Sequence, residues 1–342
     1  MKKIHVVSKA VAVTGLLLGF TASDAVAQAS VQVYGLVGAY VGSAKRSGDA
    51  SSVLQEGGGG LTTSYLGFKG NEDLGSGYKA VFALESFFRP DTGEQGRSAT
   101  DPFFARNAWV GIEGGFGRVT LGRQTNPTYT NMATLSPFGS SVVFSPLVLQ
   151  SFVATYGSAI VGDTVWNNVI EYTSPNLGGF KGAAVYGSGE VPGQPGIANM
   201  GLHGSYTQGP FTAALSAQRV RVNTPSSAVS QQDAYLGGVT YDFKLLKIYT
   251  SLEKTSSSSG IASKTYDAGL SIPITKNGSL LAEVARTKVN APKNIETART
   301  TASIGYDHFL SKRTDVYAIY VFDKKSNAGS AGTVGVGMRH TF

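Results

Sequence analysis

The chain of 342 residues contains no cysteine, which excludes disulfide bonds, thiolate metal sites and cysteine nucleophiles. Only two of its aromatic residues are Trp. No segment after residue 27 approaches the run of about 18 apolar residues that a membrane-spanning helix needs. The formal net charge is +7, but Lys and Arg form no block, so nucleic-acid binding is not indicated.

The first 27 residues differ from the rest. Three lysines surround the start of an apolar run, Ala10–Phe20, and Ala25 to Ala27 has the small-x-small pattern of a cleavage site. The apolar run is too short to cross ~30 Å of hydrocarbon. We therefore predict that residues 1–27 are a signal peptide and that residues 28–342 form a single exported domain beginning at Gln28.

An alternation of apolar and polar residues recurs along the mature chain, and glycine is abundant with 44 residues. A soluble all-β protein and a membrane β-barrel would both fit these two facts. Sixteen strands are predicted at Val31–Val41, Leu61–Gly70, Tyr78–Phe88, Phe103–Gly114, Arg118–Gln124, Val165–Thr173, Phe180–Gly189, Asn199–Thr207, Phe211–Val222, Asp233–Phe243, Leu246–Thr255, Lys264–Ile274, Ser279–Val289, Thr297–Phe309, Thr314–Lys324 and Gly332–Phe342.

The connections between these strands alternate in length. Short turns such as Gly114–Gly117 and Leu310–Arg313 are separated by longer loops such as Ser43–Gly60, Arg89–Pro102 and Ser256–Ser263. Short turns at one rim and long loops at the other are typical of an even-stranded antiparallel barrel in the outer membrane. A soluble sandwich gives no reason for this order, so the alternation favours the membrane barrel.

The same alternation assigns faces to the strands. In the last strand, Val334, Val336 and Met338 share an apolar face with the terminal Phe342, whereas Arg339 takes the opposite face. An apolar face suits lipid or a neighbouring subunit, and the opposite face suits lumen water. This strand must also pair with the first one, because unpaired backbone groups in hydrocarbon cost several kcal/mol each.

Several motifs are similar to those of the trimeric general porins of Gram-negative bacteria, and closest to the porins of β-proteobacteria. The stretches that carry the resemblance are Val33-Tyr34-Gly35, Tyr65-Leu66-Gly67-Phe68-Lys69-Gly70, Arg106-Asn107-Ala108-Trp109-Val110-Gly111, Leu121-Gly122-Arg123-Gln124, Leu310-Ser311-Lys312-Arg313-Thr314 and the terminal Phe342. They span nearly the whole mature sequence in the order and spacing of the family.

The resemblance implies a sixteen-stranded antiparallel barrel whose long third loop, here Thr125–Thr164, folds into the lumen. The family often has Pro-Glu-Phe-Gly at the loop tip, but this chain has Pro137-Phe138-Gly139 without the acid. An arginine that is common at the start of the sixth strand is replaced by Val165-Trp166. The loop contains one acidic residue, Asp163, so charge selectivity cannot simply be transferred from relatives.

The pore-forming residues are hypotheses at this point. Arg106 is expected to face the lumen because Asn107 and Trp109 are assigned to the other face. Arg123 either borders the constriction or braces the loop or a subunit contact. The constriction is predicted at Arg106, Arg123, Pro137, Phe138, Gly139 and Asp163, and the charged lumen wall at Lys69, Lys79, Glu85 and Glu171.

The sequence gives little support for catalysis or for metal or cofactor binding. The three mature histidines, His203, His308 and His340, lie on separate predicted strands without metal-site spacing, and no G-x-S-x-G motif is present. We therefore expect no catalytic, metal or cofactor site. An outer-membrane barrel hydrolase and a structural or adhesive barrel remain the alternative functions.

The sequence thus predicts an outer-membrane porin for ions and small hydrophilic solutes. A basic mature chain with a loop poor in acids predicts a mild preference for anions, with Arg106 as the chief contributor. The resemblance implies a homotrimer, contact with outer-membrane lipid and lipopolysaccharide, and a barrel-assembly signal at Phe342.

Overall fold

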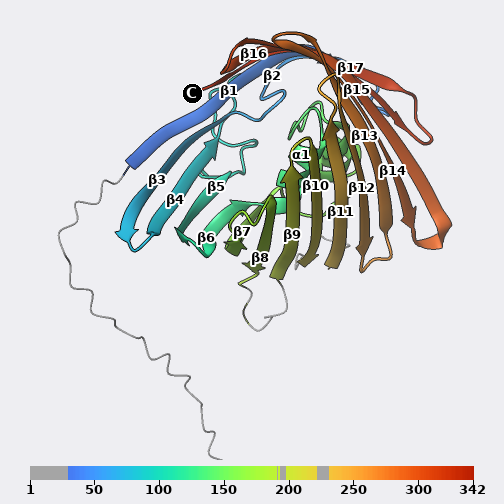
Figure 1. Cartoon of the computed structure of the whole chain (residues 1–342). Helices are drawn as coiled ribbons and strands as arrows, with labels where there is room; N and C mark the ends of the chain where they lie inside the picture. Colours follow the sequence, from blue (N-terminus) through green and yellow to red (C-terminus); the bar gives the residue numbers. More distant parts are fainter. Residues whose placement is uncertain (1–29, 191, 193–197, 222–230) are drawn as a thin grey trace, which may run out of the picture.

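A computed structural model describes residues 30–190, 192, 198–221 and 231–342 of the chain. The predicted signal peptide, residues 1–27, lies outside the described residues. Figure 1 shows one continuous sheet that curves around the helices α1 (Pro127–Leu135) and α2 (Pro146–Phe152). No helix within the described ranges is long and apolar enough to cross a membrane.

Seventeen strand segments make up this sheet. They are β1 Ser30–Ala44, β2 Val53–Gly58, β3 Tyr65–Gly75, β4 Tyr78–Phe87, β5 Asn107–Gly114, β6 Gly117–Thr125, β7 Val165–Thr173, β8 Phe180–Ser188, β9 Ala198–Gln208, β10 Phe211–Arg221, β11 Gln231–Asp242, β12 Lys247–Ser257, β13 Ala262–Thr275, β14 Gly278–Ala291, β15 Ile295–Ser311, β16 Thr314–Lys325 and β17 Ala331–Thr341.

The sheet closes on itself through the first and last strands. β1 pairs antiparallel with β17 from Leu36 opposite Thr341 to Ser43 opposite Val334. On its other side β1 pairs with both β2 and β3, which are therefore two segments of one barrel strand. The fold is a closed sixteen-stranded antiparallel barrel, as predicted, and closure leaves no sheet edge exposed to hydrocarbon.

The interruption of the second barrel strand was not predicted. Residues 53–58 were assigned to a loop but form β2, and the strand expected to begin at Leu61 begins at Tyr65. Gly59 and Gly60 have φ values of +94° and +66°, which favour glycine, and they turn the chain out of the sheet. Leu61 is consequently buried in a cluster with residues of the long loop. The predicted strand Phe103–Gly114 also begins later, at Asn107.

The two faces of the barrel follow the predicted alternation. Side chains such as Leu215 and Val336 are 65% and 55% exposed on the outer face. Glu253 and Thr301 take the opposite parity and are fully buried inside. Arg339 also points inward, where its guanidinium bonds to Asp315. A lipid-compatible exterior and a polar interior are the arrangement that a barrel in a bilayer requires.

The two rims of the barrel differ in their connections. One rim, the short-turn rim, carries tight turns such as residues 76–77, 115–116 and 312–313. The other, the long-loop rim, carries connections that include residues 88–106 and 126–164, although those between β12 and β13 and between β14 and β15 are short. Exposed outward aromatics cluster near the short-turn rim, namely Tyr78, Phe116, Tyr172, Phe180, Tyr241, Phe243 and Phe309. This is the position of an aromatic girdle at the lipid interface.

The long connection between β6 and β7 has secondary structure of its own. The Asn126 side chain accepts a hydrogen bond from the Thr128 amide and caps α1, while Ser145 caps α2 in the same way from the Val148 amide. Each cap is followed by a proline at the start of the helix, where its missing N–H costs nothing. These signals were present in a segment that shows only weak alternation.

Candidate functional site

The interior of the barrel is divided by the way the long loop packs. α1 contacts β9 to β12, and α2 contacts β13 to β15. Met132 and Leu135 of α1 are fully buried against the inward side chains of Ala214 and Leu236. Apart from the contact of α1 with β9, the loop therefore lies against one wall, formed by β10 to β16, which we call the covered wall. The wall formed by β3 to β9 is the open wall.

A second apolar cluster holds the middle of the loop. Phe144 is completely buried, and its ring lies edge-on to Tyr40 and Tyr317 with centroid distances of 5.3 and 5.9 Å. Ile319 and Val321 of β16 join this cluster from the inner face. Apolar side chains that point into a barrel must pack against other apolar side chains to be shielded from water, and the loop provides these side chains.

A buried carboxylate fastens the loop tip to β14. Glu283 accepts hydrogen bonds from Ser136 Oγ at 2.6 Å, Ser145 Oγ at 3.3 Å and the Leu147 amide at 3.0 Å. The Leu147 amide is one of the free donors in the first turn of α2, so one side chain satisfies the loop and a helix terminus together. Ser151 Oγ makes a similar bond of 2.8 Å to Glu253 of β12.

An ion cluster closes the root of the loop. Arg97, from the β4–β5 connection, places Nη1 2.7 Å from Asp163 Oδ1 and Nε 2.9 Å from Asp101 Oδ2. Burial alone would raise the pKa of the Asp163 carboxyl, but hydrogen bonds and charge from Arg97 outweigh it, so the pKa lies below its usual value. Burial likewise opposes the lowering of the Asp101 pKa, and hydrogen bonds and charge from Arg97 again outweigh it.

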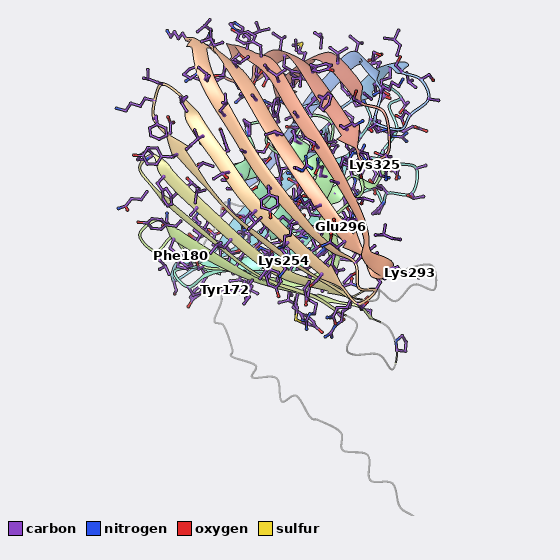
Figure 2. All side chains as sticks on the ribbon, turned by 90° about the vertical axis from the view of Figure 1, so that its right-hand side faces the viewer. Tyr172, Phe180, Lys254, Lys293, Glu296 and Lys325 are labelled. Carbon is purple, nitrogen blue, oxygen red and sulfur yellow. The ribbon has the colours of Figure 1, made fainter. Side chains whose placement is uncertain are left out.

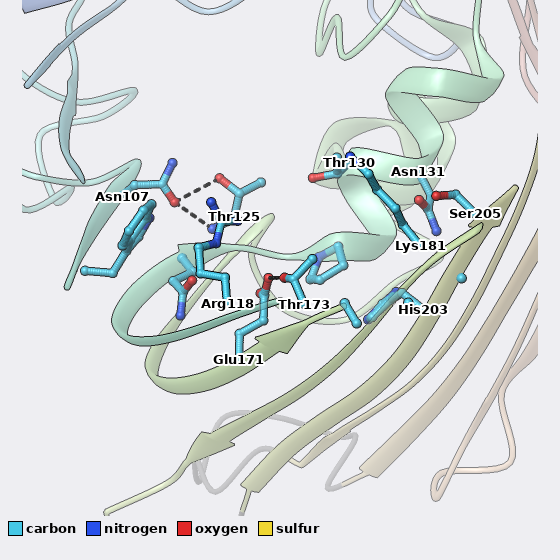
Figure 3. Close-up of a pocket in the computed structure, with 16 residues that line it drawn as sticks. Asn107, Arg118, Thr125, Thr130, Asn131, Glu171, Thr173, Lys181, His203 and Ser205 are labelled. Atoms are coloured by element: carbon cyan, nitrogen blue, oxygen red, sulfur yellow. Dashed lines mark hydrogen bonds between the residues drawn. The ribbon is translucent and has the colours of Figure 1, made fainter. Parts of the chain in front are cut away.

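The open wall borders two connected hollows of about 360 and 340 Å³. Asn107, Trp109 and Arg118 line both of them. Figure 3 shows Arg118 and Glu171 along the first hollow, with Lys181 lying between the wall and α1. The charged residues of the two hollows are Lys69, Lys79, Glu85, Glu113, Arg118, Glu171 and Lys181.

Four cations of this wall, Lys69, Lys79, Arg118 and Lys181, and two acids, Glu113 and Glu171, form no ion pair within the described part of the chain. Arg118 stacks over Trp109 at 5.3 Å, and Lys69 lies 4.5 Å from the centre of the Tyr34 ring. Glu85, in contrast, is buried and accepts bonds from three side chains.

The predicted parity of Asn107 and Trp109 is wrong. Both line the interior hollows, whereas Val110 and Ile112 are exposed on the outer face. Arg106 precedes β5 and is not governed by its alternation. Its guanidinium nevertheless reaches the inner face, where it pairs with Glu85 and stacks 4.2 Å from the centroid of Tyr65, a residue with inward parity.

The structure does not bring the six predicted constriction residues together at one point. Arg123 bonds to the Ala105 carbonyl at 2.7 Å and lies 3.5 Å from Asp163, so both belong to the root of the loop. Phe138 is 2% exposed and belongs to the covered wall's apolar cluster. Neighbouring Pro137 lies close to Gly269 of β13, and Gly139 turns the chain with φ of +60°.

The predicted lumen-wall residues lie together on the open wall. Lys69, Lys79 and Glu85 line one hollow, and Glu171 lines the other, where Thr173 donates a 3.0 Å hydrogen bond to it. Phe342 is 40% exposed at the seam of the barrel, and its backbone exchanges two hydrogen bonds with Gly35.

Two cations of the open wall were missed. Arg118 and Lys181 line the larger hollow but were not selected from the sequence. The inward orientation of both cations could have been predicted from the alternation. Leu121 on β6 and Tyr186 on β8 are apolar residues of the opposite parity, and both are exposed on the outer face. The position of the hollow could not be predicted from the sequence, since it depends on which wall the loop covers.

A closed sixteen-stranded barrel with a lipid-compatible exterior and a charged, hollow interior is the architecture of a porin. Residues 10–328 match the model of the Gram-negative porin family, so the chain belongs to this family. Outer membrane porin protein 32 of Delftia acidovorans is 30% identical over 317 residues, which cover 90% of this chain and 88% of that one. An outer membrane porin protein of Bordetella pertussis is 26% identical over 336 residues, covering 82% of each chain.

Solved structures agree with this assignment. The anion-selective porin from Comamonas acidovorans superposes with a TM-score of 0.78 at 27% identity, covering 92% of this chain and all of that one. The protein is therefore an outer-membrane channel of a Gram-negative bacterium and not an enzyme, which decides against the barrel hydrolase.

Proposed function

We propose that this porin conducts small hydrophilic solutes with a mild preference for anions. The observation that carries this is the charge balance of the open wall. Four of its cations, Lys69, Lys79, Arg118 and Lys181, lack an ion pair within the described part of the chain, against two such acids, Glu113 and Glu171, while Glu85 is bound by Arg106. A water-filled passage with low-dielectric walls concentrates ions of the opposite sign. The similarity to an anion-selective porin supports the same sign.

Arg106 is not the chief contributor in this proposal. Its charge is offset by Glu85, with which it forms an ion pair. Arg118 takes that place, because it lines both hollows and its guanidinium stacks on the Trp109 ring instead of pairing with an acid. The loop narrows the passage by covering one wall, so solutes pass along the other.

Reversal potentials of single channels in a salt gradient test this proposal. The wild type is expected to conduct stepwise and to favour anions, and Arg118→Gln is expected to reduce that preference. The double variant Glu85→Gln/Arg106→Gln, which removes one charge of each sign, should stay near the wild type. Lys312→Gln in a short turn is the control for loss of charge alone. Cation preference in the wild type would contradict the proposal.

We also propose that three copies assemble through the wall that contains β1 and β17. The outward residues there are aliphatic, with Val33, Val37 and Val336 each at least 40% exposed. Such a surface suits a neighbouring subunit as well as lipid. Unheated protein should migrate as a trimer in a denaturing gel, and Val37→Asp should migrate as a monomer. A wild-type monomer under all mild conditions would oppose this assembly.

We further propose that the two ends of the chain direct its export and its insertion into the outer membrane. Residues 1–27 act as a cleaved signal peptide, which N-terminal sequencing of the mature protein would test by the presence of Gln28. Phe342 acts as the signal for the barrel-assembly machinery, in addition to its backbone bonds to Gly35. Deleting Phe342 should impair insertion in cells and leave refolding in detergent near normal. Equal loss in both would instead make Phe342 a purely structural anchor.

A further inference from the structure

Three lysines stand in one row on the outside of the barrel. Lys254 of β12 lies directly opposite Lys264 of β13, and Lys264 lies directly opposite Lys288 of β14. All three are exposed. Directly opposed side chains on neighbouring strands are about 5 Å apart at Cβ, and like charges in such pairs are destabilising. A row of this kind calls for an anion that bridges the three ammonium groups.

No acid in the described part of the chain pairs with these ammonium groups. Among the described residues, no salt bridge involves any of the three lysines or the neighbouring Arg286 of β14. Arg286 makes one long hydrogen bond, 3.4 Å, to Thr300. The three lysines and Arg286 border an open hollow of about 520 Å³, which Glu296 also lines as its one acid.

Another pair of charges on the outer face behaves differently. Arg219 of β10 and Asp233 of β11 have outward parity, since Leu215 and Tyr235 on the same strands are exposed outside. These two residues pair with each other at 2.6 Å. These two outward charges thus neutralise each other, whereas four cations on β12 to β14 share their hollow with one acid.

The row of lysines lies where the apolar exterior ends on the side of the long-loop rim. The next outward residues toward the short-turn rim are Leu252 on β12 and Tyr266 on β13, which are 49% and 51% exposed. In the other direction the strands end within a few residues, at the long-loop rim. Figure 2 shows Glu296 nearer to Lys293 of the β14–β15 connection than to the aromatic residues Tyr172 and Phe180. Cations in this zone meet lipid headgroups, and apolar residues beside them meet acyl chains.

We propose that Lys254, Lys264, Lys288 and Arg286 form a binding site for the phosphate groups of an anionic glycolipid in the outer leaflet. The lysines bridge phosphate oxygens with charge-assisted hydrogen bonds, and the Arg286 fork adds planar contacts. Tyr266 and Leu252 pack against the first carbons of the acyl chains. This site rests on the location of the barrel in the outer membrane, and it specifies on which strands and by which groups an anionic glycolipid is held.

Lipid binding by the purified, refolded porin in detergent tests the site, with lipid A and dephosphorylated lipid A as probes. The triple variant Lys254→Gln/Lys264→Gln/Lys288→Gln should bind lipid A on the order of tenfold more weakly than the wild type, as measured by native mass spectrometry. The matched control Lys244→Gln/Lys276→Gln/Lys312→Gln removes the same charge from the short-turn rim and should bind like the wild type.

Three further results are decisive. Without lipid, the triple variant should be at least as stable as the wild type, because the like-charge row is removed, so weaker binding cannot be assigned to misfolding. Its conductance and ion preference should be unchanged, which separates this site from the channel function. Equal binding of lipid A by the triple variant and the wild type, equal binding of dephosphorylated lipid A by the wild type, or full competition by millimolar inorganic phosphate would each overturn the proposal.

Discussion

The covered wall and the open wall present similar outer faces to lipid and very different inner faces to the lumen. On β16 of the covered wall, Ile319 and Val321 point inward as well as Asp315 and Asp323, and all four are buried. On the open wall, Arg118 borders a hollow and makes no ion pair with any described residue. The difference shows that the covered wall is packed like a protein core, whereas the part of the open wall that borders the hollows is a solvated surface.

This contrast has an energetic consequence. Side chains of the covered wall lose packing or buried hydrogen bonds when they are truncated, and both are costly. The cations that border the hollows of the open wall are not fully buried, so their truncation changes the field in the passage more than the free energy of unfolding. Substitutions on the two walls should therefore separate stability from selectivity.

The largest effect is expected for Phe144→Ala. Phe144 is fully buried between two tyrosines, and removal of such a side chain costs about 3–5 kcal/mol in the free energy of unfolding. Chemical unfolding of the refolded protein measures this loss, with added channel noise as a second readout. Trp109→Ala on the open wall is the matched control. The contrast between the walls fails if both variants are destabilised equally.

Glu283→Ala should have the next largest effect. It leaves the two serine hydroxyls and the Leu147 amide without their buried acceptor, at a cost of about 2 kcal/mol. The loop tip should then be cut faster by a protease added to the refolded protein. Glu113→Ala, an acid of the open wall, should stay within roughly 0.5 kcal/mol of the wild type. Equal proteolysis of both variants would argue against Glu283 as the fastening point.

The root cluster predicts a dependence on pH. Because the pKa values of Asp163 and Asp101 are lowered in the folded protein, their stabilisation is present above the unfolded value of about 3.8 and is lost as the pH falls through the lower folded values. Melting temperatures at pH 7 and at successively lower pH should show this loss in the wild type. Arg97→Gln should remove part of it. A variant with the same acid dependence as the wild type would exclude the cluster as its source.

The smallest change in stability is expected for Lys181→Gln. Since Lys181 borders the larger hollow and pairs with no acid in the described ranges, the free energy of unfolding should change by less than roughly 0.5 kcal/mol. The reversal potential in a salt gradient should nevertheless move toward cations. Lys312→Gln at the short-turn rim should change neither quantity. A large loss of stability in Lys181→Gln would mean that the open wall is not a solvated surface.

Much of the barrel could be predicted because its signals are local. Alternation assigned the outward residues of β17, and the order of short turns and long loops placed the strands within a few residues. The interruption at Gly59 and Gly60 was missed, since the reason for it is Leu61 packing against a loop far away in the sequence. Asn107 and Trp109 were assigned to the wrong face because Arg106 was treated as part of the strand.

The sequence by itself determined the closed barrel, because a period of two and the need to pair every backbone group in hydrocarbon leave few alternatives. Only the tertiary structure decided which wall the long loop covers. That choice depends on contacts of α1, α2 and the residues between them with strands far along the chain, such as Ser136 with Glu283, which are 147 residues apart, and no local pattern encodes them. Because of the position of the long loop, Phe138 is a core residue and not the predicted pore residue, and Arg118 and Lys181 are cations that border the hollow.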